Sequence, residues 1–169
     1  FPKIPPVEVT REQAPCKEIT LEGDDIDLTK FAFMQTNPYD DGRYINTASV
    51  FTTDPKMGPN YGTYRCALRG PRKLGFNPEP GQTANRMMQA AIKRGEKTAP
   101  IALVIGQDPM VWMISGTKVA LRFGPKPVDE LALAGGFRGK PVDVVKCDTN
   151  DMLIPAHCEM VIEGDVLLA

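Results

Sequence analysis

Glycine and proline set the first limit on how this chain can fold. Its 169 residues include 15 Gly and 16 Pro, spread along the whole sequence. Because these residues interrupt regular helices and strands and favour turns, we expect short elements with frequent turns between them. The sequence shows no internal repeat and no low-complexity segment. A chain of this length is enough for one domain with a sizeable core.

Strands outnumber helices in the hydrophobic patterning. Runs rich in β-branched, aromatic or alternating apolar residues predict strands at Arg43–Thr53, Tyr61–Arg69, Pro100–Gly106, Pro141–Cys147 and Cys158–Gly164. Helical spacing predicts helices at Thr83–Lys97, Asp108–Gly116 and Val128–Gly136. In the first helix we expect Thr83 as the N-cap, Gly95 as the stop, and Met87, Met88, Ala91 and Ile92 on one face. The pattern favours an α+β fold, a mainly antiparallel sheet or barrel with peripheral helices, preceded by an acidic, Pro-rich lead-in over residues 1–30.

The overall charge excludes some classes of partner. Net charge is −1 and no run of twenty apolar residues occurs, so we expect neither nucleic-acid nor membrane binding, and any anion site must be local. The four cysteines form no C-x-x-C pair and no zinc-like spacing with the single histidine. Two disulfides are conceivable, but the ordinary composition favours a reducing, cytoplasmic setting.

One stretch, "PNYGTYRCALRGPRKLG" from Pro59 to Gly75, combines Gly, Tyr and basic residues. Gly62 allows a ligand to approach the backbone, and Arg65 shares the polar face of the strand with Thr63. A fixed guanidinium there suits a phosphate or carboxylate. An Arg-bearing strand with a solvated face is the commoner situation, and the residues alone favour that interpretation.

Three other segments have both a functional and a plain explanation. Glu130 follows Asp129 at a helix start, where a carboxylate either binds Mg²⁺ or Mn²⁺ or simply complements the helix dipole. Ser115–Lys118 is either a backbone nest for phosphate or an ordinary turn. Lys146–Asp151 lacks the Gly and Glu of a calcium loop, so a turn held by Asp and Asn side chains is preferred.

Nucleophilic catalysis is not indicated. His157 and Cys158 are neighbours in a predicted strand and so point to opposite faces. No phosphate loop, dinucleotide fingerprint or nucleophile elbow occurs.

Five segments agree in order and spacing with one enzyme family. They include "NYGTYRCALRGPRKLG" and "VIGQDPMVWMISG", and the set covers residues 40–55, 60–75, 104–116, 128–151 and 154–164. Together they resemble the central part of the UbiD family of reversible decarboxylases, over the chain from about Cys16 onward. The sequences of these segments are most similar to those of members that act on hydroxylated aromatic acids, such as the protocatechuate decarboxylases of the AroY type.

The resemblance implies a split β-barrel that binds prenylated FMN together with Mn²⁺ (or Mg²⁺) and K⁺. It makes Arg65 the catalytic residue, facing the flavin and the substrate carboxylate. Metal ligands would be Asn60, Gln82 and Glu130, although the family often has His where this chain has Gln82. The remaining implied cofactor contacts are Tyr61, Gly62, Thr63, Tyr64, Gly81, Ser115 and Gly116, with Thr117 completing the turn for K⁺ and phosphate.

The resemblance also implies partners and a longer chain. We expect an aromatic carboxylic acid such as 3,4-dihydroxybenzoate and CO₂ as reactants, a flavin prenyltransferase as cofactor supplier, and a homo-oligomer. The family's catalytic glutamates follow the segment "VIEGDV" by roughly ten residues, so the 169 residues are expected to be the central cofactor domain of a longer protein and inactive alone. A flavin-binding module without turnover and an ordinary FMN oxidoreductase remain the alternatives.

Overall fold

The computed structural model describes residues 2–117 and 129–168. Within these residues the α-helices are α1 (Thr83–Lys93), α2 (Pro109–Ser115) and α3 (Glu130–Arg138). The strands are β1 (Val7–Glu8), β2 (Tyr44–Ile45), β3 (Ser49–Asp54), β4 (Gly58–Thr63), β5 (Cys66–Gly70), β6 (Lys73–Phe76), β7 (Thr98–Ile105), β8 (Asp143–Lys146), β9 (Leu153–Pro155) and β10 (Met160–Leu167). Four 3-10 turns, η1 (Arg11–Gln13), η2 (Pro15–Lys17), η3 (Gly23–Asp25) and η4 (Leu28–Lys30), fill the N-terminal segment.

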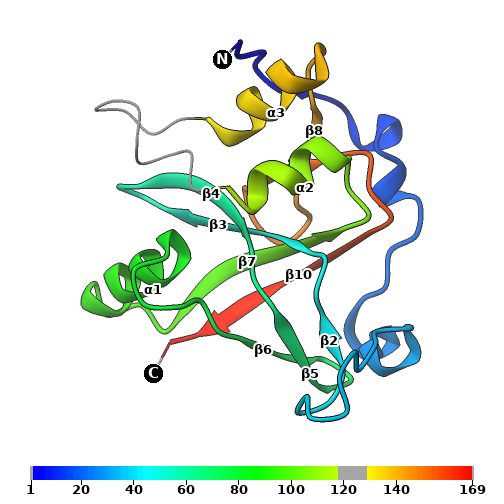
Figure 1. Ribbon diagram of the computed structural model, residues 1–169, viewed down its shortest axis with the longest axis vertical. Coiled ribbons are helices and arrows are strands. Elements are labelled where there is room, and N and C mark those ends of the chain that lie inside the picture. The colour runs from blue at the N-terminus through cyan, green and yellow to red at the C-terminus, as the bar shows by residue number, and fades with distance from the viewer. Residues whose placement is uncertain (1, 118–128, 169) are drawn as a thin grey trace.

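The strands form three small sheets with orders β10-β7-β3-β4, β2-β5-β6 and β1-β8-β9. All pairings are antiparallel except β1 with β8. In Figure 1, α1 lies on one side of the four-stranded sheet, and α2 and α3 lie together near its other end. The α+β, mainly antiparallel prediction is therefore confirmed, and the short elements accord with the many Gly and Pro.

Two predicted strands are each divided between two sheets. The predicted strand Arg43–Thr53 is β2 and β3 with a break at Asn46–Ala48, and Tyr61–Arg69 is the end of β4 and β5 with a break at Tyr64–Arg65. At these breaks both segments pass between the β2-β5-β6 sheet and the four-stranded sheet (Figure 1). Hydrophobic patterning did not predict the breaks, because the alternation of apolar and polar residues in each segment is the same as in one continuous strand.

The helices were predicted well, apart from details at their ends. In α1, Gln82 rather than Thr83 is the N-cap, and Ile92 is 37% exposed while Met87, Met88 and Ala91 are buried. Gly95, just beyond the helix, has φ 81°, as expected of a stop signal. Asp108 and Asp129 cap α2 and α3 by accepting from backbone amides two and three residues onward.

The N-terminal segment is part of the domain rather than a loose arm. β1 pairs with β8, and the Ile4 amide donates to the Ala132 carbonyl of α3 at 2.9 Å. A side chain at Gly135 would lie 2.5 Å from the Ile4 carbonyl oxygen. The glycine pair in α3 therefore lets the segment approach the helix backbone closely, which explains glycine in a helix interior.

Candidate functional site

The site is organised by β4, which forms one edge of the four-stranded sheet. Asn60 and Tyr61 are buried on neighbouring positions of this strand. The Asn60 side-chain amide (Nδ2) donates to Thr52 Oγ1 at 3.2 Å, and Thr52 is the residue directly opposite on β3. Because an edge strand has backbone N–H groups without a strand partner, side chains from other elements can bind it.

Glu130 supplies such a contact from the first turn of α3. Its Oε2 accepts from the Tyr61 amide at 3.1 Å, and its carbonyl accepts from the Tyr61 hydroxyl at 3.3 Å. Burial, together with the nearby Asp129 charge, raises the pKa of Glu130 to about 7, although the Tyr61 amide opposes the shift. No ion pair with Glu130 occurs within the described ranges. A partly buried carboxylate of this kind is suited to a cation.

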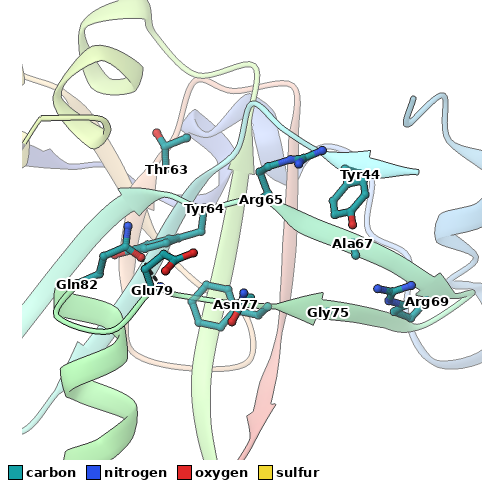
Figure 2. A pocket seen from close by; sticks show the side chains of 11 residues that line it. Tyr44, Thr63, Tyr64, Arg65, Ala67, Arg69, Gly75, Asn77, Glu79 and Gln82 are labelled. Atoms are coloured by element: carbon teal, nitrogen blue, oxygen red, sulfur yellow. Dashed lines mark hydrogen bonds between the residues drawn. The ribbon is translucent and has the colours of Figure 1, made fainter. Parts of the chain in front are cut away.

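A cavity of about 470 Å³ lies beyond the end of β4. It is lined by Tyr44, Thr63, Tyr64, Arg65, Ala67, Arg69, Gly75, Phe76, Asn77, Glu79 and Gln82. Figure 2 shows Gln82, Glu79 and Tyr64 grouped at one end, with Arg69 at the other and Arg65 between them. Four predicted site residues, Thr63, Tyr64, Arg65 and Gln82, therefore share one cavity wall.

Arg65 is held in place by three partners. Its Nε donates to Asn46 Oδ1 at 3.0 Å, and an Nη donates to Asp40 Oδ1 at 3.2 Å. Its guanidinium lies 4.2 Å from the centre of the Tyr44 ring, next to which it is drawn in Figure 2. The side chain is 54% exposed, so it combines a fixed position with access to a ligand. The residues alone had favoured an Arg on a solvated face; the side chain is indeed exposed, but these contacts fix its guanidinium.

Tyr64 changes the expected role of Gly62. A β-carbon at Gly62 would lie 2.9 Å from the Tyr64 ring, so the space above this glycine is already filled by an aromatic side chain. The Tyr64 ring meets Phe76 edge-on at 5.5 Å and 85°. Burial raises the pKa of the Tyr64 hydroxyl, while hydrogen bonds from the Ala84 backbone and the Asn60 side chain act to lower it. A ligand reaching Gly62 from this side must displace Tyr64.

The turn after α2 touches the same strand end. Ser115 Oγ lies 2.6 Å from Thr63 Oγ1 and also donates to the Trp112 carbonyl. The backbone amides of Gly116 and Thr117 both donate to the Ile114 carbonyl, so they are not free to form the phosphate nest considered above. A helix C-terminus favours positive charge, which suits the implied K⁺ better than a phosphate. Lys118 lies outside the described residues.

The three predicted metal ligands are near β4 but already have partners. Gln82 Oε1 accepts from the Glu79 amide at 2.6 Å, while Asn60 and Glu130 make the contacts given above. No group of three His, Cys, Asp or Glu side chains close enough for a metal is found in the described part of the chain. Two amides and one carboxylate nevertheless suit a hard cation, and Glu130 supplies the partly buried charge that such a cation would neutralise.

The structure also shows the surroundings of Gly81, His157 and the turn at Lys146–Asp151. Gly81 lies in the turn before α1 with φ 90°, which explains glycine there. His157 contacts Asp143 at 3.2 Å rather than Cys158. Asn150 Oδ1 accepts from the Met152 amide, as expected for a turn held by its own side chains. Sequence reasoning missed Tyr44, Asp40 and Asn46, whose contact with Arg65 depends on strand pairing and has no local signal.

A family model for the 3-octaprenyl-4-hydroxybenzoate carboxy-lyase Rift-related domain (UbiD) matches residues 7–169. The chain belongs to the UbiD family. It is 33% identical over 174 residues to a phenolic acid decarboxylase of Sedimentibacter hydroxybenzoicus, covering 99% of this chain and 35% of that protein.

Solved structures of UbiD-class enzymes have the same fold. An evolved dimeric form of HmfF from Pelotomaculum thermopropionicum, in complex with prenylated FMN, matches with a TM-score of 0.86 and 32% identity, over 98% of this chain and 37% of that one. The 3,4-dihydroxybenzoic acid decarboxylase AroY of Klebsiella pneumoniae matches with a TM-score of 0.85 and 26% identity, over 98% and 34%. The chain thus spans about a third of the length of these relatives.

Proposed function

We propose that this UbiD-family chain is the cofactor-binding domain of an enzyme that reversibly decarboxylates aromatic acids, with hydroxylated acids such as 3,4-dihydroxybenzoate as substrates. One observation carries the proposal: Arg65 is fixed by Asp40, Asn46 and Tyr44 at the wall of the cavity. A guanidinium held in this way can orient a carboxylate instead of sampling solvent. The decarboxylases among the relatives support the same chemistry.

The cofactor we propose is prenylated FMN, which is bound in the HmfF structure. Its contacts would come from the residues Asn60, Tyr61, Gly62, Thr63, Tyr64, Arg65, Gly81, Gln82, Ser115 and Gly116. When bound, the modified flavin supplies an electrophilic centre that stabilises the electrons released as CO₂ leaves. The chain's own residues bind and orient: Arg65 holds the substrate carboxylate, and Tyr64 and Phe76 exclude water from one end of the cavity.

The proposed metal is Mn²⁺ or Mg²⁺, held by Asn60, Gln82 and Glu130. Glu130 fits this role because it is a partly buried carboxylate whose raised pKa reflects a charge that desolvation disfavours. Gln82 would have to release the Glu79 amide to offer its oxygen. K⁺ would bind at the end of α2, where Ser115 and the helix carbonyls lie.

The architecture we propose is the split β-barrel of the cofactor domain. It is supported by the passage of both β2–β3 and β4–β5 from one sheet to the other. We also propose that the longer protein is a homo-oligomer, with a flavin prenyltransferase as its cofactor supplier.

The test is CO₂ release from 3,4-dihydroxybenzoate by the full-length protein, supplied with prenylated FMN, Mn²⁺ and K⁺. Plain FMN is the matched control and should support binding without turnover. Absence of CO₂ release from this acid and from related phenolic acids would refute the proposal. Turnover of a redox substrate with plain FMN and no metal would instead favour the oxidoreductase alternative.

A second candidate is a flavin-binding module without turnover, which the coverage of about a third of the relatives' length favours for these 169 residues alone. The same assay on residues 1–169 decides this point. We expect flavin binding, measured by fluorescence quenching, without CO₂ release. Release by the 169 residues would refute the module.

A further inference from the structure

Two half-buried thiols from distant parts of the chain meet on the side of the domain formed by the N-terminal segment. Cys16 lies in η2, and Cys158 lies between β9 and β10. Their thiols donate to the same oxygen, the Pro155 carbonyl, at 3.9 and 3.5 Å. The Cys16 amide also donates to the Ala156 carbonyl at 3.3 Å, which fixes η2 against this turn. The two sulfur atoms are therefore directed to one point by the backbone.

The surroundings make one of the two thiols acidic. A hydrogen bond from Cys158, with help from the Lys17 charge, lowers the pKa of Cys16 to about 7, although burial and Asp148 oppose the shift. The same bond raises the pKa of Cys158, as expected for two thiols that share a proton. Ion pairs with Asp148 at 3.2 Å and with Glu163 at 3.1 Å hold the Lys17 ammonium in place beside Cys16.

The other two cysteines, Cys66 and Cys147, differ from this pair in burial and in the pKa of their thiols. Cys66 is fully buried and Cys147 is 5% exposed. Burial raises the pKa of each thiol to about 12. Because only the thiolate is a strong nucleophile, these two cysteines serve as unreactive controls within the same molecule.

We propose that Cys16 and Cys158 are a peroxide-oxidisable dithiol that closes a reversible disulfide between η2 and the turn before β10. The Cys16 thiolate attacks a hydroperoxide, the O–O bond breaks, and a sulfenic acid and an alcohol or water form. The Cys158 sulfur then attacks the sulfenic sulfur, the S–S bond forms, and the hydroxyl leaves as water with the Cys158 proton. The two thiols lose two electrons in total, and the peroxide gains them.

The disulfide would tie the N-terminal segment covalently to the sheet. Without it, this edge is held by the short β1–β8 pairing and by ion pairs such as Lys17–Glu163. A cross-link between residues so far apart in sequence restricts the unfolded chain strongly. Oxidation should therefore raise the melting temperature by about 5–10 °C. The proposal is independent of the decarboxylase chemistry.

The experiment begins with reduced full-length protein freed of reductant and treated with a small excess of hydrogen peroxide. Free thiols are then blocked under denaturing conditions, and the protein is digested without reductant for mass spectrometry. We expect a linked peptide pair containing Cys16 and Cys158, a mass loss of about 2 Da and full reversal by dithiothreitol. Cys66 and Cys147 should be recovered as blocked thiols.

Serine variants complete the test. Cys158→Ser should halt oxidation at the sulfenic or higher acid of Cys16, and Cys16→Ser should leave Cys158 reduced. Cys16→Ser should also abolish the rise in melting temperature on oxidation. Wild-type protein that yields a Cys16 sulfinic acid with no linked peptide would overturn the proposal. So would a link that involves Cys66 or Cys147 at a comparable yield.

Discussion

Replacing Arg65 with Ala should separate function from stability. The side chain is 54% exposed; its partner Tyr44 lies in β2, and Asn46 lies in the segment between β2 and β3. The hydrogen bond to Asn46, the ion pair with Asp40 and the cation–π contact with Tyr44 are together worth about 1–2 kcal/mol at this half-exposed site. For a domain of this size, that loss corresponds to a fall in melting temperature of about 2–8 °C.

The effect on turnover should be far larger. If Arg65 orients the substrate carboxylate, its loss removes both a charge-assisted bond and the alignment of the reacting group. Misplacement of a reacting group costs about 100-fold in rate, so we expect kcat/KM to fall at least that much. The assay is CO₂ release by the full-length protein, with melting temperature and flavin binding measured on the same samples.

Arg69→Ala is the matched control. Arg69 also lines the cavity and forms an ion pair, with Asp41 at 2.7 Å, but it belongs to no family motif. We expect its activity to stay within a few-fold of wild type. Equal losses in the two variants would mean that the charge of the cavity matters rather than the position of Arg65. Wild-type activity in Arg65→Ala would refute its catalytic role.

Three further predictions concern the sheet and the metal site. Gly62→Ala should lower the free energy of unfolding by about 1–3 kcal/mol in urea titrations, because the new methyl group meets the Tyr64 ring, whereas Gly164→Ala, with nothing within 4 Å, should change it little. Burial acts to raise the pKa of Asp54, but two backbone amides and an arginine outweigh it and hold the pKa below its usual 3.8. Ionised Asp54 thus stabilises the fold above pH 3.8, and this stability should be lost as the pH falls through its lower folded-state pKa. Asp54→Asn should flatten that part of the curve of unfolding free energy against pH. A curve unchanged by the substitution would contradict this reasoning. Gln82→His should tighten Mn²⁺ binding measured by calorimetry and Gln82→Ala should weaken it, and equal affinity in all three proteins would remove Gln82 from the ligand set.

None of the helices in the described part of the chain is long and apolar enough to cross a membrane.

The sequence by itself indicated the helices, most of the longer strand regions and the residues that carry the family likeness. Helical spacing located α1, α2 and α3, and the motif around Asn60 and Arg65 indicated the segment proposed to carry the site. These signals are local, because periodicity and capping depend on residues within one or two turns of each other.

The tertiary structure alone decided which groups meet. It placed Tyr64 over Gly62, put Asp40 and Tyr44 around Arg65, and brought Cys16 to Cys158. None of these contacts leaves a periodic or compositional signal, since each depends on how strands are paired and where a chain crosses between sheets. The family motif around Arg65 was therefore readable from the sequence, but the fixing of its guanidinium was not.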